Sequence, residues 1–212
     1  MDDRRLIYFA DPMCSWCYGF SPVISEIQRT FGDRLPIQLV MGGLRPGTDE
    51  PMSDKVRTSL RTHWPHITEA SGQPFDYAVL DRENFVYDTD PAARAVVVLR
   101  RVDPNLALAY LARIQTAFYA QNQDITSAEV LADLAAEMGV AREGFLEHFE
   151  TPQARKETWQ DYAVSQRAGV TGFPTLVGGP NEDGAFGVVT RGFAPADQVL
   201  GVLKDWVEGA SA

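Results

Sequence analysis

The N-terminal part of the chain carries two successive hydrophobic patterns. Residues 5–10 form a short apolar run, which predicts a buried strand. Apolar residues then recur at three- and four-residue spacing, which predicts a helix from Cys14 to a cap at Gly32, kinked at Pro22. The apolar positions of this helix are Phe20, Val23, Ile24, Ile27 and Phe31. A second strand is expected within residues 35–44, and the strand–helix–strand order favours parallel pairing.

The middle of the chain has helical patterns and no strand signal. Helices are expected over 52–63 and 66–72, from 91, from 104 to about 121, from 126 to near 139, over 141–149 and over 152–168. Asp90-Pro91 and Asp103-Pro104 each combine an N-cap with a proline at the first helical position. Thr126 and Glu129 have the spacing of a capping box, which predicts that a helix begins at Thr126.

The last part of the chain returns to a strand pattern. Residues 175–177 and 187–191 are expected as strands, and the turn-rich link 178–184 predicts a hairpin between them. A closing helix is expected over 195–207, with one face made by Val199, Leu200, Leu203, Trp206 and Val207. We expect one sheet built from both ends of the chain, because strands without partners would leave exposed edges.

Composition and charge exclude several classes of protein. Of the 212 residues 45% are hydrophobic, and the longest apolar run, Leu106–Ala112, is too short to cross a membrane. A formal net charge of −10 leaves no basic footprint of the kind that binds nucleic acid. The apolar stretch Leu6–Ala10 is shorter than the core of a secretory signal. We therefore expect a soluble, cytoplasmic protein that binds neither nucleic acid nor a membrane.

The chain has two cysteines, Cys14 and Cys17, spaced C-x-x-C at the predicted start of a helix. Side chains three residues apart on a helix are neighbours, close to disulfide range. Free N–H groups and the positive end of the helix dipole favour the thiolate of Cys14. Structural disulfides are rare in the cytosol. We therefore expect Cys14 to be the exposed attacking thiolate and Cys17 the more buried resolving thiol.

Three other uses of the cysteine pair stay open at this point. A zinc site would need His63 and His66 as further ligands, but their spacing is unusual for structural zinc and we expect no metal. The pair could also be two unreactive structural thiols. A Cys–His hydrolase would need His63, His66 or His148 beside a cysteine, and the second cysteine would then lack a purpose.

A second motif lies far along the chain, where Gly169-Val170-Thr171-Gly172-Phe173-Pro174-Thr175-Leu176 forms a loop that opens a strand. Together with Asp11–Phe20 (DPMCSWCYGF), it resembles the thioredoxin fold in its DsbA-family variant, and most of all the cytosolic FrnE-like branch. The resemblance implies an α/β thioredoxin-like domain of residues 1–48 and 170–212, with a large all-helical inserted domain over 49–169. It also implies that Pro174 is cis and packs against an active-site disulfide.

The resemblance implies a protein thiol–disulfide oxidoreductase that reduces or isomerises disulfides. The catalytic residues would be Cys14, Cys17 and Pro174. The residues expected to contact substrate are Met13, Trp16, Tyr18, Phe173 and Thr171. We expect disulfide-containing proteins or peptides as substrates, and glutathione or a thioredoxin-type protein as reductant. No cofactor is expected besides the Cys14–Cys17 disulfide, and the protein is expected to be a monomer or homodimer.

Several finer hypotheses accompany this one. The backbone of Phe173 could pair with an extended substrate segment. Asp11 could accept the proton of Cys17 through water, although a turn residue that binds its own backbone is the simpler interpretation. Kappa-class glutathione transferases and 2-hydroxychromene-2-carboxylate isomerases share the inserted fold but carry serine where Cys14 stands. A glutathione-dependent transferase or isomerase of small molecules is therefore the main alternative, and a non-catalytic binding module is another.

Overall fold

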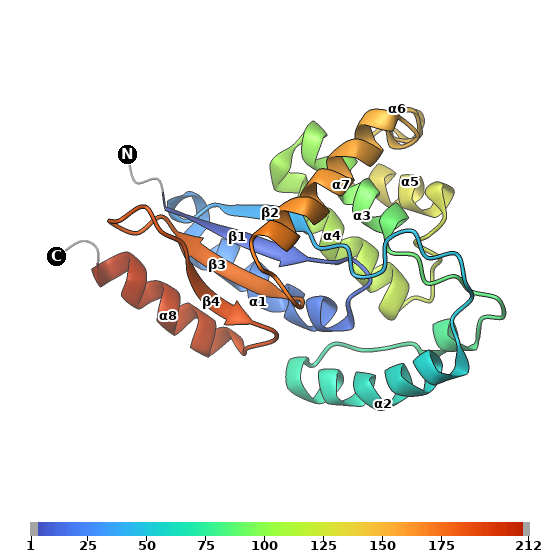
Figure 1. The fold of residues 1–212 in the computed structure, drawn as a ribbon, viewed down its shortest axis with the longest axis horizontal. Helices are drawn as coiled ribbons and strands as arrows, with labels where there is room; N and C mark the ends of the chain where they lie inside the picture. The colour runs from blue at the N-terminus through green and yellow to red at the C-terminus, as the bar shows by residue number, and fades with distance from the viewer. Residues whose placement is uncertain (1–3, 210–212) are drawn as a thin grey trace.

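Four strands and eight α-helices make up residues 4–209, the part of the chain that the computed structural model describes (Figure 1). The strands are β1 (Arg5–Ala10), β2 (Ile37–Met41), β3 (Thr175–Gly179) and β4 (Gly187–Arg191). The helices are α1 (Ser15–Phe31), α2 (Asp54–Ser71), α3 (Asp90–Val102), α4 (Pro104–Tyr119), α5 (Ala128–Ala136), α6 (Arg142–Phe149), α7 (Pro152–Arg167) and α8 (Ala196–Gly209). Two short 3-10 turns are η1 (Gly32–Arg34) and η2 (Tyr77–Asp81).

The strands form one mixed sheet in the order β2-β1-β3-β4. β1 pairs parallel with β2 and antiparallel with β3, so that Tyr8 lies between Leu39 and Leu176. β3 and β4 form the expected antiparallel hairpin, with an irregularity between Leu176 and Val177. Both ends of the chain therefore build a single sheet, and the predicted α/β fold with a helical insertion between β2 and β3 is confirmed.

The helices of the insertion gather beside one part of the sheet, except α2, which lies apart from them along the lower edge of Figure 1. α7 packs against β2, α8 packs against α1 and β4, and α2 and α4 both contact α1. One cluster of buried apolar side chains runs through the sheet and the insertion. The division into two domains at residues 48 and 170 stays a prediction. Residues 1–3 and 210–212 of the predicted thioredoxin-like domain lie outside the described part of the chain. None of the helices within residues 4–209 is both long and apolar enough to span a membrane.

Two charged side chains of the insertion cover the outer edge of β2. Arg100 of α3 donates hydrogen bonds to the Leu39 carbonyl and to Asp161 of α7, each at 2.7 Å. The Met41 N–H donates to the same Asp161 carboxylate at 2.9 Å. An uncovered edge strand is a template for pairing with another chain. This ion pair therefore satisfies backbone groups of β2 that no strand reaches.

The two helices predicted over 52–63 and 66–72 form one helix, α2, which continues through Pro65. That prediction was wrong because a proline removes one hydrogen bond and bends a helix without always ending it. Trp64 and Ile67 on either side of the proline are both fully buried. Their burial holds the two halves of α2 against the rest of the protein.

The predicted capping box is also wrong, since α5 begins at Ala128 and its N-cap is Ser127. The Thr126 hydroxyl instead donates to Asp124 at 2.6 Å, within the turn before the helix. Glu129 forms an ion pair with Arg142 of α6. Thr126 and Glu129 therefore bind Asp124 and Arg142, and they do not form the predicted capping box.

Candidate active site

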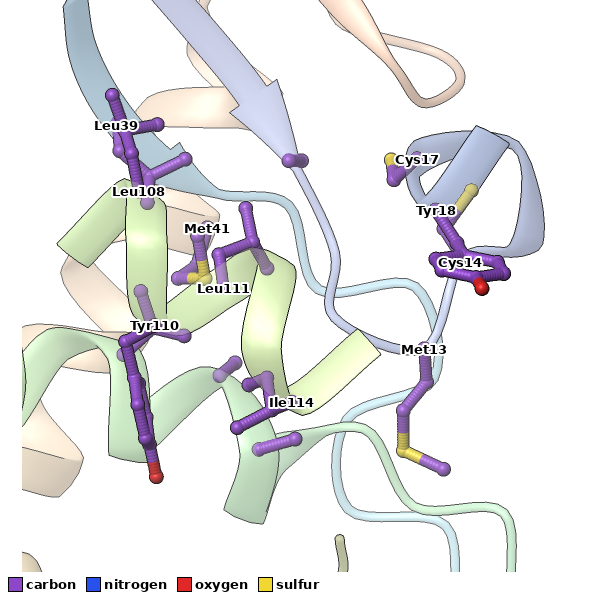
Figure 2. Close-up of a cluster of buried hydrophobic side chains, with 14 of the residues drawn as sticks. Met13, Cys14, Cys17, Tyr18, Leu39, Met41, Leu108, Tyr110, Leu111 and Ile114 are labelled. Atoms are coloured by element: carbon purple, nitrogen blue, oxygen red, sulfur yellow. The ribbon is translucent and has the colours of Figure 1, made fainter. Parts of the chain in front are cut away.

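The two cysteines lie where β1 ends and α1 begins, and both are free thiols. Cys14 is the N-cap of α1, and its N–H donates to the Asp11 carbonyl at 3.1 Å. Figure 2 shows Cys14, Cys17 and Tyr18 together at the start of α1, with Met13 in the loop before it. Cys14 is 7% exposed and Cys17 is fully buried. The more accessible sulfur is therefore the one at the tip of the helix.

The second sequence motif lies against this helix tip. The Phe173–Pro174 peptide bond is cis, as predicted. The Cys14 thiol donates to the Phe173 carbonyl, with 3.5 Å between sulfur and oxygen. The Pro174 carbonyl accepts from the Gly192 N–H at 2.7 Å, which joins the loop to the end of β4. The fold thus brings together two motifs that are 159 residues apart in the chain.

A glycine after β2 makes room for the proline loop. A methyl group added at Gly42 would overlap the ring of Phe173. The next residue, Gly43, has a φ of +74°, and a side chain there would meet the ring of Tyr162. Position 42 needs a glycine because a side chain would have no space there. Position 43 needs one both for space and for its left-handed backbone conformation. The position of Phe173 beside Cys14 therefore depends on the Gly42-Gly43 pair.

The five residues expected to contact substrate have different environments. Met13 and Tyr18 are buried in the core, with 0% and 1% exposure. Trp16 and Phe173 are half-buried, and Thr171 is exposed. Of these five residues, only Trp16, Phe173 and Thr171 therefore expose side-chain surface. Substrate contact by Met13 or Tyr18 does not fit this burial, because both side chains already fill the core beneath the helix tip.

An aromatic residue that the sequence analysis missed also borders the site. Phe193, just after β4, packs on Trp16 with ring centroids 5.7 Å apart and on Phe20 at 6.3 Å. Phe193 shares no periodic pattern with either residue, so only the folded sheet reveals the contact. Trp16 is therefore held in place from the β4 side.

Asp11 is fully buried and links three segments of the chain. One carboxylate oxygen accepts from the Met13 N–H at 2.9 Å and the other from the Leu44 N–H at 2.7 Å. Burial raises the pKa of Asp11 to about 6, although these hydrogen bonds and one from Thr89 lower it in part. The bond to Met13, two residues on, fits the simpler interpretation of Asp11 as a turn residue. A role in accepting the Cys17 proton stays a hypothesis.

Burial also raises the pKa of the Cys17 thiol, and the neighbouring Cys14 raises it further. A hydrogen bond with the Asp11 backbone lowers the pKa of Cys17 in part. In an apolar interior the charged form of a thiol is disfavoured unless a donor or a cation faces it. Cys17 is therefore a neutral thiol until it ionises to attack the Cys14 sulfur.

Two further tyrosines support the loop before Cys14. The Tyr87 hydroxyl donates to the Met13 carbonyl at 2.7 Å, and the Tyr119 hydroxyl lies 3.2 Å from that of Tyr87. Both rings are buried, and the charge of Cys14 contributes to raising the pKa of each hydroxyl after burial itself. No sequence pattern connects Tyr87 and Tyr119 to the cysteines, because they come from the inserted segment.

A groove with a volume of about 520 Å³ opens beside Phe173 on the face of the sheet. Phe9 of β1 and Val188 of β4 form part of its apolar wall, and Thr171 and Arg191 are among its polar lining residues. Within residues 4–209, no three histidine, cysteine or acidic side chains are placed to hold a metal ion. The site therefore combines a dithiol with a proline loop. The groove adjoins the loop at Phe173, and neither cysteine is among its lining residues.

A family model described as Thioredoxin matches residues 8–199, and the chain therefore belongs to this thioredoxin family. Its structural neighbours include proteins described as disulfide oxidoreductases. A candidate protein disulfide isomerase from Nitrosomonas europaea superposes with a TM-score of 0.89 at 32% identity, over 97% of this chain and 98% of that one.

A second neighbour is DsbM from Pseudomonas aeruginosa, described as a cytosolic disulfide reductase. It has a TM-score of 0.75 and 30% identity over 98% of this chain and 97% of that chain, and one of its structures contains glutathione. Among curated relatives, the ClpXP adapter protein SpxH of Halalkalibacterium halodurans is 21% identical over 93% of this chain. The chain spans 65% of the length of that relative. The two structural neighbours are thus described as disulfide-exchanging proteins, whereas the curated relative is described as an adapter protein.

Proposed function

We propose that this protein is a cytoplasmic disulfide reductase or isomerase that acts through Cys14 and Cys17, with glutathione as its reductant. The observation that carries the proposal is the Cys14 thiol at the tip of α1, bonded to the carbonyl that precedes a cis proline. Similarity to a cytosolic reductase that binds glutathione supports the compartment and the reductant.

The proposed reaction has two exchange steps. The Cys14 thiolate attacks a substrate disulfide, forms a mixed disulfide and releases one substrate thiolate. The Cys17 thiolate then attacks the Cys14 sulfur, so that the Cys14–Cys17 bond forms and the second substrate thiolate leaves. Two electrons have passed from the protein to the substrate. Two glutathione thiols return them, forming glutathione disulfide and the free dithiol.

The proline loop and the groove beside it are the proposed substrate-binding surface. No residue within 4–209 accepts a hydrogen bond from the Phe173 N–H, and this backbone edge lies next to Cys14. An extended peptide can pair with such an edge, while its side chains enter neighbouring pockets. We assign Trp16, Phe173 and Thr171 to this surface, because their side chains are accessible and because Phe173 and Thr171 line the groove.

Reduction of insulin by the full-length chain, with glutathione and glutathione reductase, tests the proposal. The wild-type protein should reduce insulin faster than glutathione alone, and Cys14→Ser should abolish that difference. Cys17→Ser should stop turnover and accumulate a mixed disulfide between Cys14 and insulin, visible by mass spectrometry. Wild-type rates in Cys14→Ser, or no acceleration by the wild type, would overturn the proposal.

The glutathione-dependent transferase remains a second candidate because of the glutathione-containing neighbour. Conjugation of glutathione to 1-chloro-2,4-dinitrobenzene distinguishes it from the reductase. A transferase would show saturable conjugation that survives Cys17→Ser, since its chemistry needs one sulfur at most. A reductase would lose activity toward insulin in the same variant.

A further inference from the structure

The groove beside Phe173 lies on the face of the sheet opposite to α8. A methyl group added at Gly178 would meet Trp206 of α8 and Leu6 of β1, so α8 covers the face that carries these side chains. The next residue of β1, Ile7, lines the groove. Successive side chains of a strand point to opposite faces of the sheet. The floor of the groove is therefore a sheet face that α8 does not cover.

Two aromatic side chains mark the ends of this groove. Phe173 precedes β3, and Phe186 lies against Gly179 at the other end of the same strand. The five residues of β3 span roughly 16 Å in strand geometry. A groove of about 520 Å³ that follows a strand over this length has the shape to accept an extended chain segment.

Strand pairing arranges the floor of the groove in two rows across the sheet. The rows are Phe9, Thr175 and Arg191, and Ile7, Val177 and Val188. Residues two positions apart on a strand share one face and are roughly 6.6 Å apart. Alternate side chains of an extended ligand have the same spacing. A ligand that lies along β3 can therefore place one side chain over each row.

Arg191 gives the first row its charge. Its side chain is exposed and forms no ion pair or hydrogen bond with any residue of 4–209. The Thr175 hydroxyl of the same row is already bonded to the Gly172 carbonyl at 2.8 Å. No acidic residue of the described part of the chain lines the groove, although the sequence has 29 acidic and 19 basic residues. The charge that complements this groove is therefore a carboxylate.

The second row is apolar and accessible. Val188 is 51% exposed, and Ile7 and Val177 of the same row are half-buried. Val170 and Phe186 also line the groove and add apolar surface to it. Accessible apolar surface of this kind is typical of an interaction site. The complement of this row is an apolar side chain.

We propose that the groove binds an extended peptide segment in which an acidic and an apolar residue are two positions apart. The carboxylate binds the Arg191 guanidinium, and the apolar side chain packs on Val188. Arg191 is thus a specificity-determining residue for substrates that carry an acidic side chain. This inference rests on the proposed function, because it takes the segment to be part of a disulfide-containing substrate.

Two contacts connect the groove to the cysteine pair. Phe173 lines the groove, and its carbonyl accepts the hydrogen bond from the Cys14 thiol. Arg191 is followed by Gly192, whose N–H donates to the Pro174 carbonyl at 2.7 Å. The charged row is therefore the one nearer to the proline loop. In a bound substrate the acidic residue lies nearer than the apolar residue to the exchanging disulfide.

Isothermal titration calorimetry of the reduced protein with short peptides tests this proposal. The probe is Gly-Ser-Asp-Thr-Leu-Gly, acetylated and amidated so that Asp has the only carboxylate. In two comparison peptides Lys replaces Asp or Ser replaces Leu. The wild-type protein should bind the Asp–Leu peptide about tenfold more tightly than the Lys–Leu peptide, because the charged hydrogen bond is lost. Arg191→Glu should reverse this preference.

Lys204→Glu is the matched control for Arg191→Glu. It makes the same change in net charge at an exposed position of α8, on the other face of the sheet. It should keep the wild-type preference for the Asp–Leu peptide. Val188→Thr preserves the shape of the second row but makes it polar, so it should weaken binding of the Asp–Leu peptide and leave that of the Asp–Ser peptide unchanged.

Three results would overturn the inference. They are failure of the wild-type protein to bind the Asp–Leu peptide, an unchanged preference in Arg191→Glu, and an equal reversal in Lys204→Glu. The last result would show that net charge acts at long range, without a site at Arg191.

Peptide binding and insulin reduction separate this inference from the proposed function. If the protein reduces insulin but Arg191→Glu keeps the wild-type peptide preference, the role of the groove fails alone. If the preference reverses as expected but the wild-type protein does not reduce insulin, the proposed function fails and the peptide site remains.

Discussion

Asp11 and Cys17 show at the scale of single residues how burial sets the chemistry of the site. Both side chains are fully buried at the junction of β1 and α1, and burial is the largest cause of the raised pKa of each. Asp11 has hydrogen-bond donors from Met13 and Leu44, which hold its carboxylate in the turn. For Cys17, a hydrogen bond with the Asp11 backbone lowers the pKa only in part, and its ionisation therefore depends on what surrounds its sulfur.

The raised pKa of Asp11 predicts a pH-dependent stability. Its folded pKa of about 6 is above the ordinary value of 3.8, so the folded state binds more protons than the unfolded state between these values. The free energy of unfolding should therefore fall as the pH rises through this window, by up to about 3 kcal/mol in total. Urea denaturation of the reduced protein between pH 4 and 7 measures the change.

Asp11→Asn should flatten this part of the stability profile, because the amide does not ionise. Asp33→Asn, at an exposed position of η1, is the matched control and should keep the wild-type slope. Identical slopes for wild type and Asp11→Asn would show that the carboxyl does not titrate as described.

At the scale of elements, the site depends on how closely the proline loop approaches the helix tip. The loop is positioned by the Phe173 ring on Gly42 and by the bond from Gly192 to the Pro174 carbonyl. Neither contact involves a cysteine. A change in the loop should therefore alter exchange chemistry while both thiols remain intact.

Gly42→Ala should displace Phe173, because the added methyl group would occupy the space of its ring. We expect insulin reduction to fall about tenfold to a hundredfold from misplacement of the loop. The free energy of unfolding should fall by about 1–3 kcal/mol through overpacking. Gly172→Ala, in the same loop but with open space around the added methyl group, should leave both quantities near wild type. Equal effects of the two substitutions would refute this account.

At the scale of the whole molecule, the insertion stabilises the sheet that carries the site. Arg100 and Asp161 come from two different helices of the insertion and bind the outer edge of β2 together. The next residues after β2 are Gly42 and Gly43, which border the proline loop and α7. The insertion is thus connected to the site through the sheet edge.

Arg100→Leu should lower the free energy of unfolding by about 2–3 kcal/mol, because it leaves the Leu39 carbonyl and the Asp161 carboxylate without their partner. Arg29→Leu breaks an exposed pair with Glu26 on α1 and should lower the free energy of unfolding much less, because solvent screens this pair. Chemical denaturation of the three proteins compares them. A loss in Arg100→Leu no larger than in Arg29→Leu would contradict the role assigned to the edge.

Local sequence patterns predicted most elements because each pattern reports which face of a short segment is buried. The strand 5–10, the hairpin strand 187–191 and the helix that begins after Cys14 lie where the hydrophobic spacing indicates. The errors at Pro65 and Thr126 arose where partners from elsewhere in the chain outweighed a local signal. A pattern confined to one segment contains no information about such partners.

The sequence by itself determined the dithiol at a helix start and the order of strands and helices, since spacing, turn residues and proline act over a few neighbours. The resemblance to the thioredoxin fold implied the cis proline, which the structure contains. Only the tertiary structure decided what surrounds the sulfurs. Tyr87 and Tyr119 belong to the insertion, yet their hydroxyls lie 3.2 Å apart and that of Tyr87 donates to the Met13 carbonyl in the loop before Cys14. Packing of distant segments creates this environment, and burial then sets which polar groups must find a partner.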